Sequence, residues 1–292
     1  MHVYKGMTPE ELEAQYFLRG TRPGYEENDI PGWLERSARF REKANVSLNL
    51  VYGALDRNRL DFFPAKIGPN AKTGFILYIH GGYWQRGDKS VYSYVAEPFV
   101  ERGYDVALIN YQMCPDVRIS EIAPQVREAI LWLWRNRNRF NLRLDNFNVM
   151  GHSAGGHLTV EMLATDWPAF NAGLPKYLIH SAVAVSGIYD FEPILYCSEN
   201  DGLRMDEQEA RVVSTIYRTP ASDAQLLLAH GLNEPLDMHR QSQALHEKFR
   251  HHSRRCEFLP VPKADHFEMV DVLADTSSEL FAMVLDFIRP AD

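Results

Sequence analysis

Short apolar runs alternate with longer amphipathic stretches along the chain after residue 45. The later runs are almost continuous in Val, Ile, Leu, Phe and Ala, which is typical of strands buried on both faces of a sheet. The runs are VSLNLVYG, RLDFFPA, FILYIH, DVALINY, FNVMGHS, SAVAVSGIYD, LLLAHG and CEFLPVP. This alternation predicts an α/β fold with a mostly parallel central sheet of about eight strands and helices on both faces.

Two of the connections have recognisable patterns. In SEIAPQVREAILWLWRNRNRF, residues Ile122, Val126, Ile130 and Leu133 recur every three to four positions and form one apolar helix face. The first two apolar runs are separated only by ALDRNR, so we expect them to pair as an antiparallel hairpin at one edge of the sheet.

The segment before the first strand also has helical features. Thr8 is followed three positions later by Glu11, the pattern of a capping box, and PGWLERSARFREKA predicts a second helix. Neither helix is needed to complete the sheet, so residues 1–45 are predicted to form a helical lid on a catalytic domain of residues 46–292. No repeat or low-complexity linker divides the chain, which indicates a single domain overall.

Composition excludes several classes of partner and cofactor. The net charge of −8 opposes binding to nucleic acid, and no apolar stretch approaches the roughly 18 residues of a membrane span. The first residues lack the apolar core of a signal peptide, so we expect a cytoplasmic protein. Cys114, Cys197 and Cys256 lie far apart, which argues against a disulfide framework and a zinc cluster, and we expect no metal.

The stretch GHSAGG at 151–156 carries the clearest chemical signal, because it follows an apolar run and precedes a helical pattern. A G-x-S-x-G sequence in that position predicts a nucleophile elbow that presents the hydroxyl of Ser153 at the end of the sheet. The alternative is a glycine-rich turn with an ordinary capping serine. His152 and His157 are expected to pack around this turn.

A second glycine-rich stretch, HGGYW at 80–84, directly follows FILYIH. A serine attacking a carbonyl generates an oxyanion, and backbone N–H groups that bind it are worth about 2.7 to 4 kcal/mol per donor. We predict Gly82, Tyr83 and Ala154 as these donors. His80 is expected to form structural hydrogen bonds.

The predicted base is His266, in a turn after the last apolar run. The acid should lie between the serine and this histidine, after the penultimate strand, which favours Glu234 and leaves Asp237 and Asp190 as alternatives. The remaining histidines considered, His230, His239, His246, His251 and His252, are expected on or near a solvated helical stretch.

With these residues, the chain resembles the α/β-hydrolase fold family and, within it, the kynurenine formamidase (arylformamidase) group. HGGYW, GHSAGGHL, SGIYDFEPI and DHFEMV carry the resemblance, together with the N-terminal ELEAQYFLRG and YGALDRNRLDFFPA. The resemblance implies Ser153 as nucleophile and His266 as base. Members commonly place Asp at the acid position, where this chain has Glu234. Asn200 matches a pocket-facing loop position of the group.

The resemblance implies a cofactor-free serine hydrolase that forms an acyl-enzyme on an aryl amide such as N-formylkynurenine. Trp84, Tyr83 and Phe267 are predicted to line an apolar pocket for the aromatic ring, with a place in the core as the alternative. A carboxylesterase with short-acyl preference and a non-catalytic binding module remain open alternatives. The expected partner is a small aromatic amide or ester, and the formation of a homo-oligomer is left open.

Overall fold

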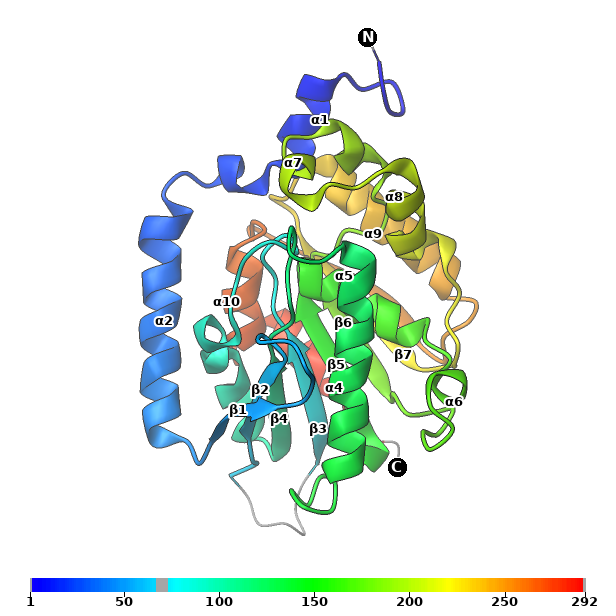
Figure 1. Ribbon diagram of the computed structural model, residues 1–292. Helices are drawn as coiled ribbons and strands as arrows, with labels where there is room; N and C mark the ends of the chain where they lie inside the picture. The colour runs from blue at the N-terminus through cyan, green and yellow to red at the C-terminus, as the bar shows by residue number, and fades with distance from the viewer. Residues whose placement is uncertain (1, 67–72, 291–292) are drawn as a thin grey trace.

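An eight-stranded sheet lies at the centre of the molecule, with strands in the order β1-β2-β4-β3-β5-β6-β7-β8 (Figure 1). The structure is a computed structural model that describes residues 2–66 and 73–290. The strands are β1 (Ser47–Val51), β2 (Arg59–Phe63), β3 (Gly74–Ile79), β4 (Tyr104–Ile109), β5 (Phe147–His152), β6 (Ser181–Val185), β7 (Gln225–Gly231) and β8 (Cys256–Val261). Each of the eight predicted apolar runs overlaps one of these strands, and none of the strands begins more than one residue before its run.

The strands in the middle of the sheet are parallel and fully buried, whereas the first two strands pair antiparallel at one edge. β1 pairs antiparallel with β2, and β2 pairs antiparallel with β4, whereas all the other pairs are parallel. Every residue of β3, β4, β5 and β6 is buried, as their continuous apolar sequences predict. The predicted edge hairpin and the mostly parallel sheet are therefore confirmed.

Helices cover both faces of this sheet (Figure 1). The α-helices are α1 (Pro9–Tyr16), α2 (Tyr25–Lys43), α3 (Glu97–Val100), α4 (Ile122–Asn136), α5 (Ala154–Leu163), α6 (Trp167–Phe170), α7 (Asn200–Leu203), α8 (Glu207–Val213), α9 (Leu236–Phe249), α10 (Glu268–Ala274) and α11 (Glu279–Phe287). In α4, the residues Ile122, Val126, Ile130 and Leu133 are all buried, so the predicted apolar face is the packed one. Within the described residues, no helix is both long and apolar enough to cross a membrane.

The N-terminal helices are packed into the fold. Thr8 and Glu11 form the predicted capping box of α1. The second helix was predicted from Pro31, but it begins at Tyr25, after Gly24 with its left-handed φ of 84°. Pro31 therefore lies inside the helix. Short 3₁₀ helices η3 (Lys89–Val91) and η4 (Ser93–Ala96) pack against α2, and α1 lies beside η7 (Glu192–Tyr196) and α9.

One histidine prediction is wrong. His230 lies on β7, not on a solvated helix, and is only 2% exposed. Its ring stacks on Phe258 of the neighbouring strand with centroids 4.8 Å apart. The physical reason is that His230 continues the apolar run LLLAHG, so the strand carries it into the sheet.

Candidate active site

Ser153 occupies a sharp turn between β5 and α5. Its φ of 57° and ψ of −120° lie outside the regions favoured by L-residues, as expected for a strained turn that holds a side chain outward. The turn is so close to β3 that a Cβ added at Gly155 would lie 1.9 Å from the carbonyl oxygen of Ile79. Glycine is therefore required there.

Ser153, His266 and Glu234 lie in a line of contacts, although they come from three separate segments. His266 Nε2 is 2.9 Å from Ser153 Oγ, and His266 Nδ1 is 3.3 Å from Glu234 Oε2. All three side chains are buried, with exposed fractions of 4–6%. Such an arrangement allows the histidine to accept the serine proton while the carboxylate orients the ring.

Two further groups hold the Glu234 carboxylate. Ser186 Oγ and the backbone N–H of Gly231 donate hydrogen bonds of 2.5 Å and 2.8 Å to Oε1, which leaves Oε2 for His266. Burial disfavours the charged carboxylate, but the hydrogen bonds from His266, Ser186 and Gly231 outweigh it and lower the pKa of Glu234 below its usual value. The group therefore carries a negative charge at neutral pH. Sequence reasoning did not single out Ser186.

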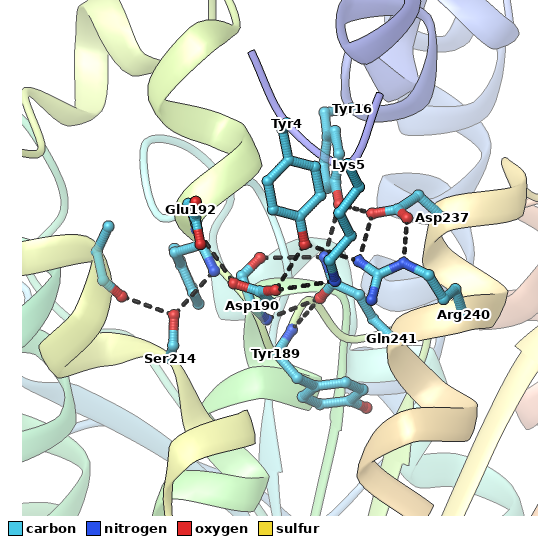
Figure 2. Close-up of polar contacts among 12 residues, drawn as sticks. Tyr4, Lys5, Tyr16, Tyr189, Asp190, Glu192, Ser214, Asp237, Arg240 and Gln241 are labelled. Atoms are coloured by element: carbon cyan, nitrogen blue, oxygen red, sulfur yellow. Dashed lines mark hydrogen bonds and ion pairs between the residues drawn. The ribbon is translucent and has the colours of Figure 1, made fainter. Parts of the chain in front are cut away.

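The two alternative acids, Asp190 and Asp237, instead bind the N-terminal segment, as Figure 2 shows. Tyr4 donates a 2.7 Å hydrogen bond to Asp190 Oδ2, and Tyr16 donates one to Asp237. Asp237 also forms an ion pair with Arg240. These carboxylates fasten the first residues of the chain to the body of the molecule.

The HGGYW loop runs directly against the serine. A Cβ added at Gly81 would lie 3.0 Å from Ser153 Cβ, and Gly82 adopts a φ of 124° at which an added Cβ would clash with the carbonyl of Arg86. Gly82 and Tyr83 both line the cavity beside Ser153, and Ala154 opens α5, where first-turn N–H groups have no acceptor within the helix. Gly82 and Tyr83 therefore share a cavity with Ser153, and Ala154 follows it directly in the chain; their role as oxyanion donors stays a prediction.

Three histidines near this loop are buried. His80 Nδ1 lies 2.6 Å from the Gly81 carbonyl oxygen, and its ring stacks on Tyr111. His157 Nε2 lies 2.8 Å from the Val213 carbonyl oxygen, and His152 Nε2 lies 2.8 Å from the carbonyl oxygen of His266 itself. Burial lowers the pKa of His80 and His157 to about 4 and that of His152 to about 3, so all three are neutral at pH 7.

A cavity of about 420 Å³, termed here the catalytic cavity, opens at Ser153 and His266. Its aromatic wall joins segments distant in sequence: Tyr25 and Phe267 pack with ring centroids 4.1 Å apart, and Trp33 lies 5.8 Å from Tyr92. The N-terminal residues that line it are Leu18, Arg19, Tyr25, Glu26, Ile30 and Trp33. Tyr83 and Phe267, two of the three aromatic residues predicted to line a pocket, belong to this wall.

Charged groups also line the catalytic cavity. Arg19 and Arg86 both belong to its wall, and both are held by Glu199, at 3.6 Å and 3.4 Å respectively. The Glu199 side chain is only 4% exposed. Arg19 also pairs with Glu26 at 3.0 Å, and its buried Nε has no hydrogen-bond partner. Among the described residues, the Arg86 guanidinium has only the contact with Glu199. Two guanidinium groups therefore belong to the cavity wall, and Arg86 is the less fully paired of the two. No local motif distinguishes these arginines in the sequence.

Two predicted pocket residues lie elsewhere. Trp84 is fully buried in the core, with its ring 4.8 Å from Phe191 and 5.4 Å from His157, because successive left-handed residues turn the loop after Gly82. Asn200 hydrogen-bonds the backbone N–H and carbonyl of Met205, so it closes its own loop and does not line the cavity. Its neighbour Glu199 contacts the cavity arginines instead.

Comparison with known proteins assigns this arrangement to a family. Residues 60–249, more than half of the chain, match the BD-FAE family. The chain belongs to the BD-FAE family. A kynurenine formamidase of Danio rerio is 28% identical over 99% of both chains. Esterase LipC of Mycobacterium tuberculosis is 27% identical over 76% of this chain and 60% of that protein.

The fold of this BD-FAE member is the α/β-hydrolase fold. The crystal structure of a provisionally assigned thioesterase from Silicibacter sp. TM1040 superposes with a TM-score of 0.80 and 30% identity, covering 93% of this chain and 98% of that chain. A carbohydrate esterase from gut microbiota superposes with a TM-score of 0.67 at 20% identity. The predicted fold class is confirmed, and this BD-FAE chain is a hydrolase.

Proposed function

We propose that this hydrolase cleaves the amide bond of an N-formyl or other short N-acyl arylamine, with Ser153 as nucleophile, His266 as base and Glu234 as the orienting acid. The observation that carries the proposal is that the contacts joining these three side chains end in a cavity with an aromatic wall. Such a cavity accepts a ring by apolar burial and edge-to-face contacts.

The reaction begins when His266 Nε2 takes the proton of Ser153 Oγ as the oxygen attacks the acyl carbon. Negative charge develops on the carbonyl oxygen, and the N–H groups of Gly82, Tyr83 and Ala154 stabilise it. His266 then gives the proton to the amide nitrogen, the carbon–nitrogen bond breaks, and the arylamine leaves. Water activated by His266 hydrolyses the acyl-serine ester.

The relatives and the charged residues of the cavity support an N-formylkynurenine-like substrate. Kynurenine formamidases cover almost the whole length of this chain. Arg86 has donors available for a carboxylate, and Glu26, which pairs with Arg19 at 3.0 Å, also lines the cavity and can accept from an ammonium group. An aryl amide with an amino-acid side chain therefore matches both the aromatic and the charged residues of the cavity wall.

The proposal includes a role for the N-terminal helices as a lid. Six of their residues line the catalytic cavity, and Arg22 bridges Asp29 of α2 to Asp265, the residue before His266, at 2.9 Å and 2.7 Å. Leu12, Tyr16, Trp33 and Phe40 are each at most 3% exposed, so deleting this segment would uncover the core. Point substitutions therefore test the lid better than truncation.

The test is turnover of N-formylkynurenine, a substituted acetanilide and p-nitrophenyl acetate, each beside Ser153→Ala. We expect amide turnover that is lost in the variant, with the formyl-to-acetyl ratio reporting the size of the acyl site. The second candidate, a short-acyl carboxylesterase, is favoured by the similarity to Esterase LipC. Cleavage of the ester alone would establish that candidate and contradict amide hydrolysis.

A further inference from the structure

His152, the residue before the nucleophile, is in contact with the base. Its Nε2 lies 2.8 Å from the carbonyl oxygen of His266, and the two rings lie 4.7 Å apart. A carbonyl oxygen only accepts, so Nε2 carries the hydrogen. Because the ring is neutral, as burial requires, its Nδ1 has a free lone pair and acts as an acceptor.

Nδ1 lies against the same glycine loop as the nucleophile. A Cβ added at Gly81 would lie 3.3 Å from His152 Nδ1 and 3.0 Å from Ser153 Cβ, so both side chains lie against the backbone of Gly81. Among the described residues, none donates a hydrogen bond to Nδ1. Nδ1 is also not fully enclosed by protein atoms. His152 lines the catalytic cavity, and Nδ1 is the ring nitrogen left to face it.

We propose that His152 is a specificity-determining residue for amides over esters, whose Nδ1 accepts a hydrogen bond from the N–H of the departing amide nitrogen. The inference rests on the proposed amide hydrolysis. An amide nitrogen must become pyramidal and turn its lone pair toward His266 before it can take a proton, which directs its N–H elsewhere. An acceptor at that place stabilises the amide transition state, whereas an ester oxygen has no hydrogen to offer.

The chemical step balances without any proton change on His152. The Ser153 Oγ–carbon bond forms and the carbon–nitrogen bond breaks. The proton that His266 took from Ser153 passes to the nitrogen, and a neutral arylamine leaves. His152 keeps its Nε2 hydrogen bonded to the His266 carbonyl oxygen throughout.

The experiment compares formanilide with phenyl formate, which have the same acyl group and ring, in the full-length enzyme. In His152→Gln, the side-chain amide reaches the place of Nε2 and can still donate to the His266 carbonyl oxygen, but the acceptor at Nδ1 is lost. We expect kcat/KM for formanilide to fall roughly tenfold more than kcat/KM for phenyl formate, the effect of one hydrogen bond. N-methylformanilide, an amide without an N–H, should follow the ester.

Two further variants separate the acceptor from a merely structural role. His152→Asn places an oxygen near Nδ1 and loses the bond to His266, so both activities should fall while the amide-to-ester ratio stays closer to that of the wild type. His157→Gln changes a buried histidine whose Nε2 contacts the Val213 carbonyl oxygen, outside the cavity wall, and should leave the ratio unchanged.

The outcomes distinguish the inference from the function on which it rests. Equal losses for formanilide and phenyl formate in His152→Gln would overturn the inference alone. Wild-type enzyme that cleaves phenyl formate but not formanilide would overturn the amide hydrolysis and the inference with it. A selective loss for formanilide, absent with N-methylformanilide, supports both.

Discussion

Ser186 donates a 2.5 Å hydrogen bond to Glu234 Oε1, while the other carboxylate oxygen of Glu234 lies 3.3 Å from His266. Ser186 immediately follows β6 and adopts a left-handed φ of 53°. This conformation is uncommon for a serine and directs its side chain toward the carboxylate. A glutamate side chain has one more rotatable bond than an aspartate, so a second anchor restricts its orientation.

Substitution of Ser186 by Ala should therefore lower kcat by about tenfold to a hundredfold, because a hydrogen bond to a charged group is worth about 1.5–3 kcal/mol. The measurement is kcat on an amide substrate. Ser181→Ala is the matched control, since Ser181 begins the same strand, is fully buried and donates to Asn148. An equal loss of kcat in both variants would contradict a specific role for Ser186.

Arg22 should link the N-terminal helices to the base. Its guanidinium lies 2.7 Å from Asp265, and Asp265 accepts hydrogen bonds from the backbone N–H groups of Phe267 and Glu268. Arg22→Met should lower kcat on amide and ester alike and reduce the free energy of unfolding by about 1 kcal/mol. Arg39→Met, which removes a pair with Glu35 on the exposed face of α2, is the control. An unchanged kcat with Arg22→Met would argue against this link.

Arg86 should discriminate between charged and neutral substrates. Arg86→Met is expected to raise KM roughly tenfold for N-formylkynurenine relative to formanilide, because a charge-assisted hydrogen bond to the carboxylate is lost. Steady-state kinetics on the two substrates measures the ratio of the KM values. If the ratio does not change, the carboxylate binds elsewhere.

Buried neutral histidines should make the fold sensitive to mild acid. The pKa values of His80, His152 and His157 are lowered to about 4, about 3 and about 4, against about 6.5 in an unfolded chain. Below pH 6.5 the unfolded state takes up protons that the folded state does not, so stability falls as the pH drops toward 4. Each histidine contributes a slope of up to about 1.4 kcal/mol per pH unit.

Urea unfolding at pH 7.5, 6.0 and 5.0 measures this dependence. The lowered pKa of Glu234 acts in the same direction at lower pH, because its contribution is present above its unfolded pKa and lost as the pH falls through the folded value. Replacing His157 by Gln should make the slope shallower. A free energy of unfolding that stays constant over this range would contradict the prediction, because it would mean that the histidines have the same pKa in the folded and the unfolded protein.

The sequence by itself determined the elements and the order of the chemical groups. The eight strands follow from continuous apolar runs, and α4 from its three-to-four-residue spacing, because burial on a strand or helix face repeats at short intervals. The elbow at Ser153 was also predictable, because its glycines are required by a turn of only a few consecutive residues. Glu234 was favoured from its place after the penultimate strand, and the structure brings it to His266.

Only the tertiary structure decided which side chains meet at the cavity. Tyr83 lines it while Trp84 enters the core, a choice made by the left-handed backbone of one loop. Tyr25 reaches Phe267, and Arg19 reaches Glu199, across most of the chain. Contacts between residues so far apart depend on how the helices and loops dock on the sheet, which no short-range pattern of apolar and polar positions encodes.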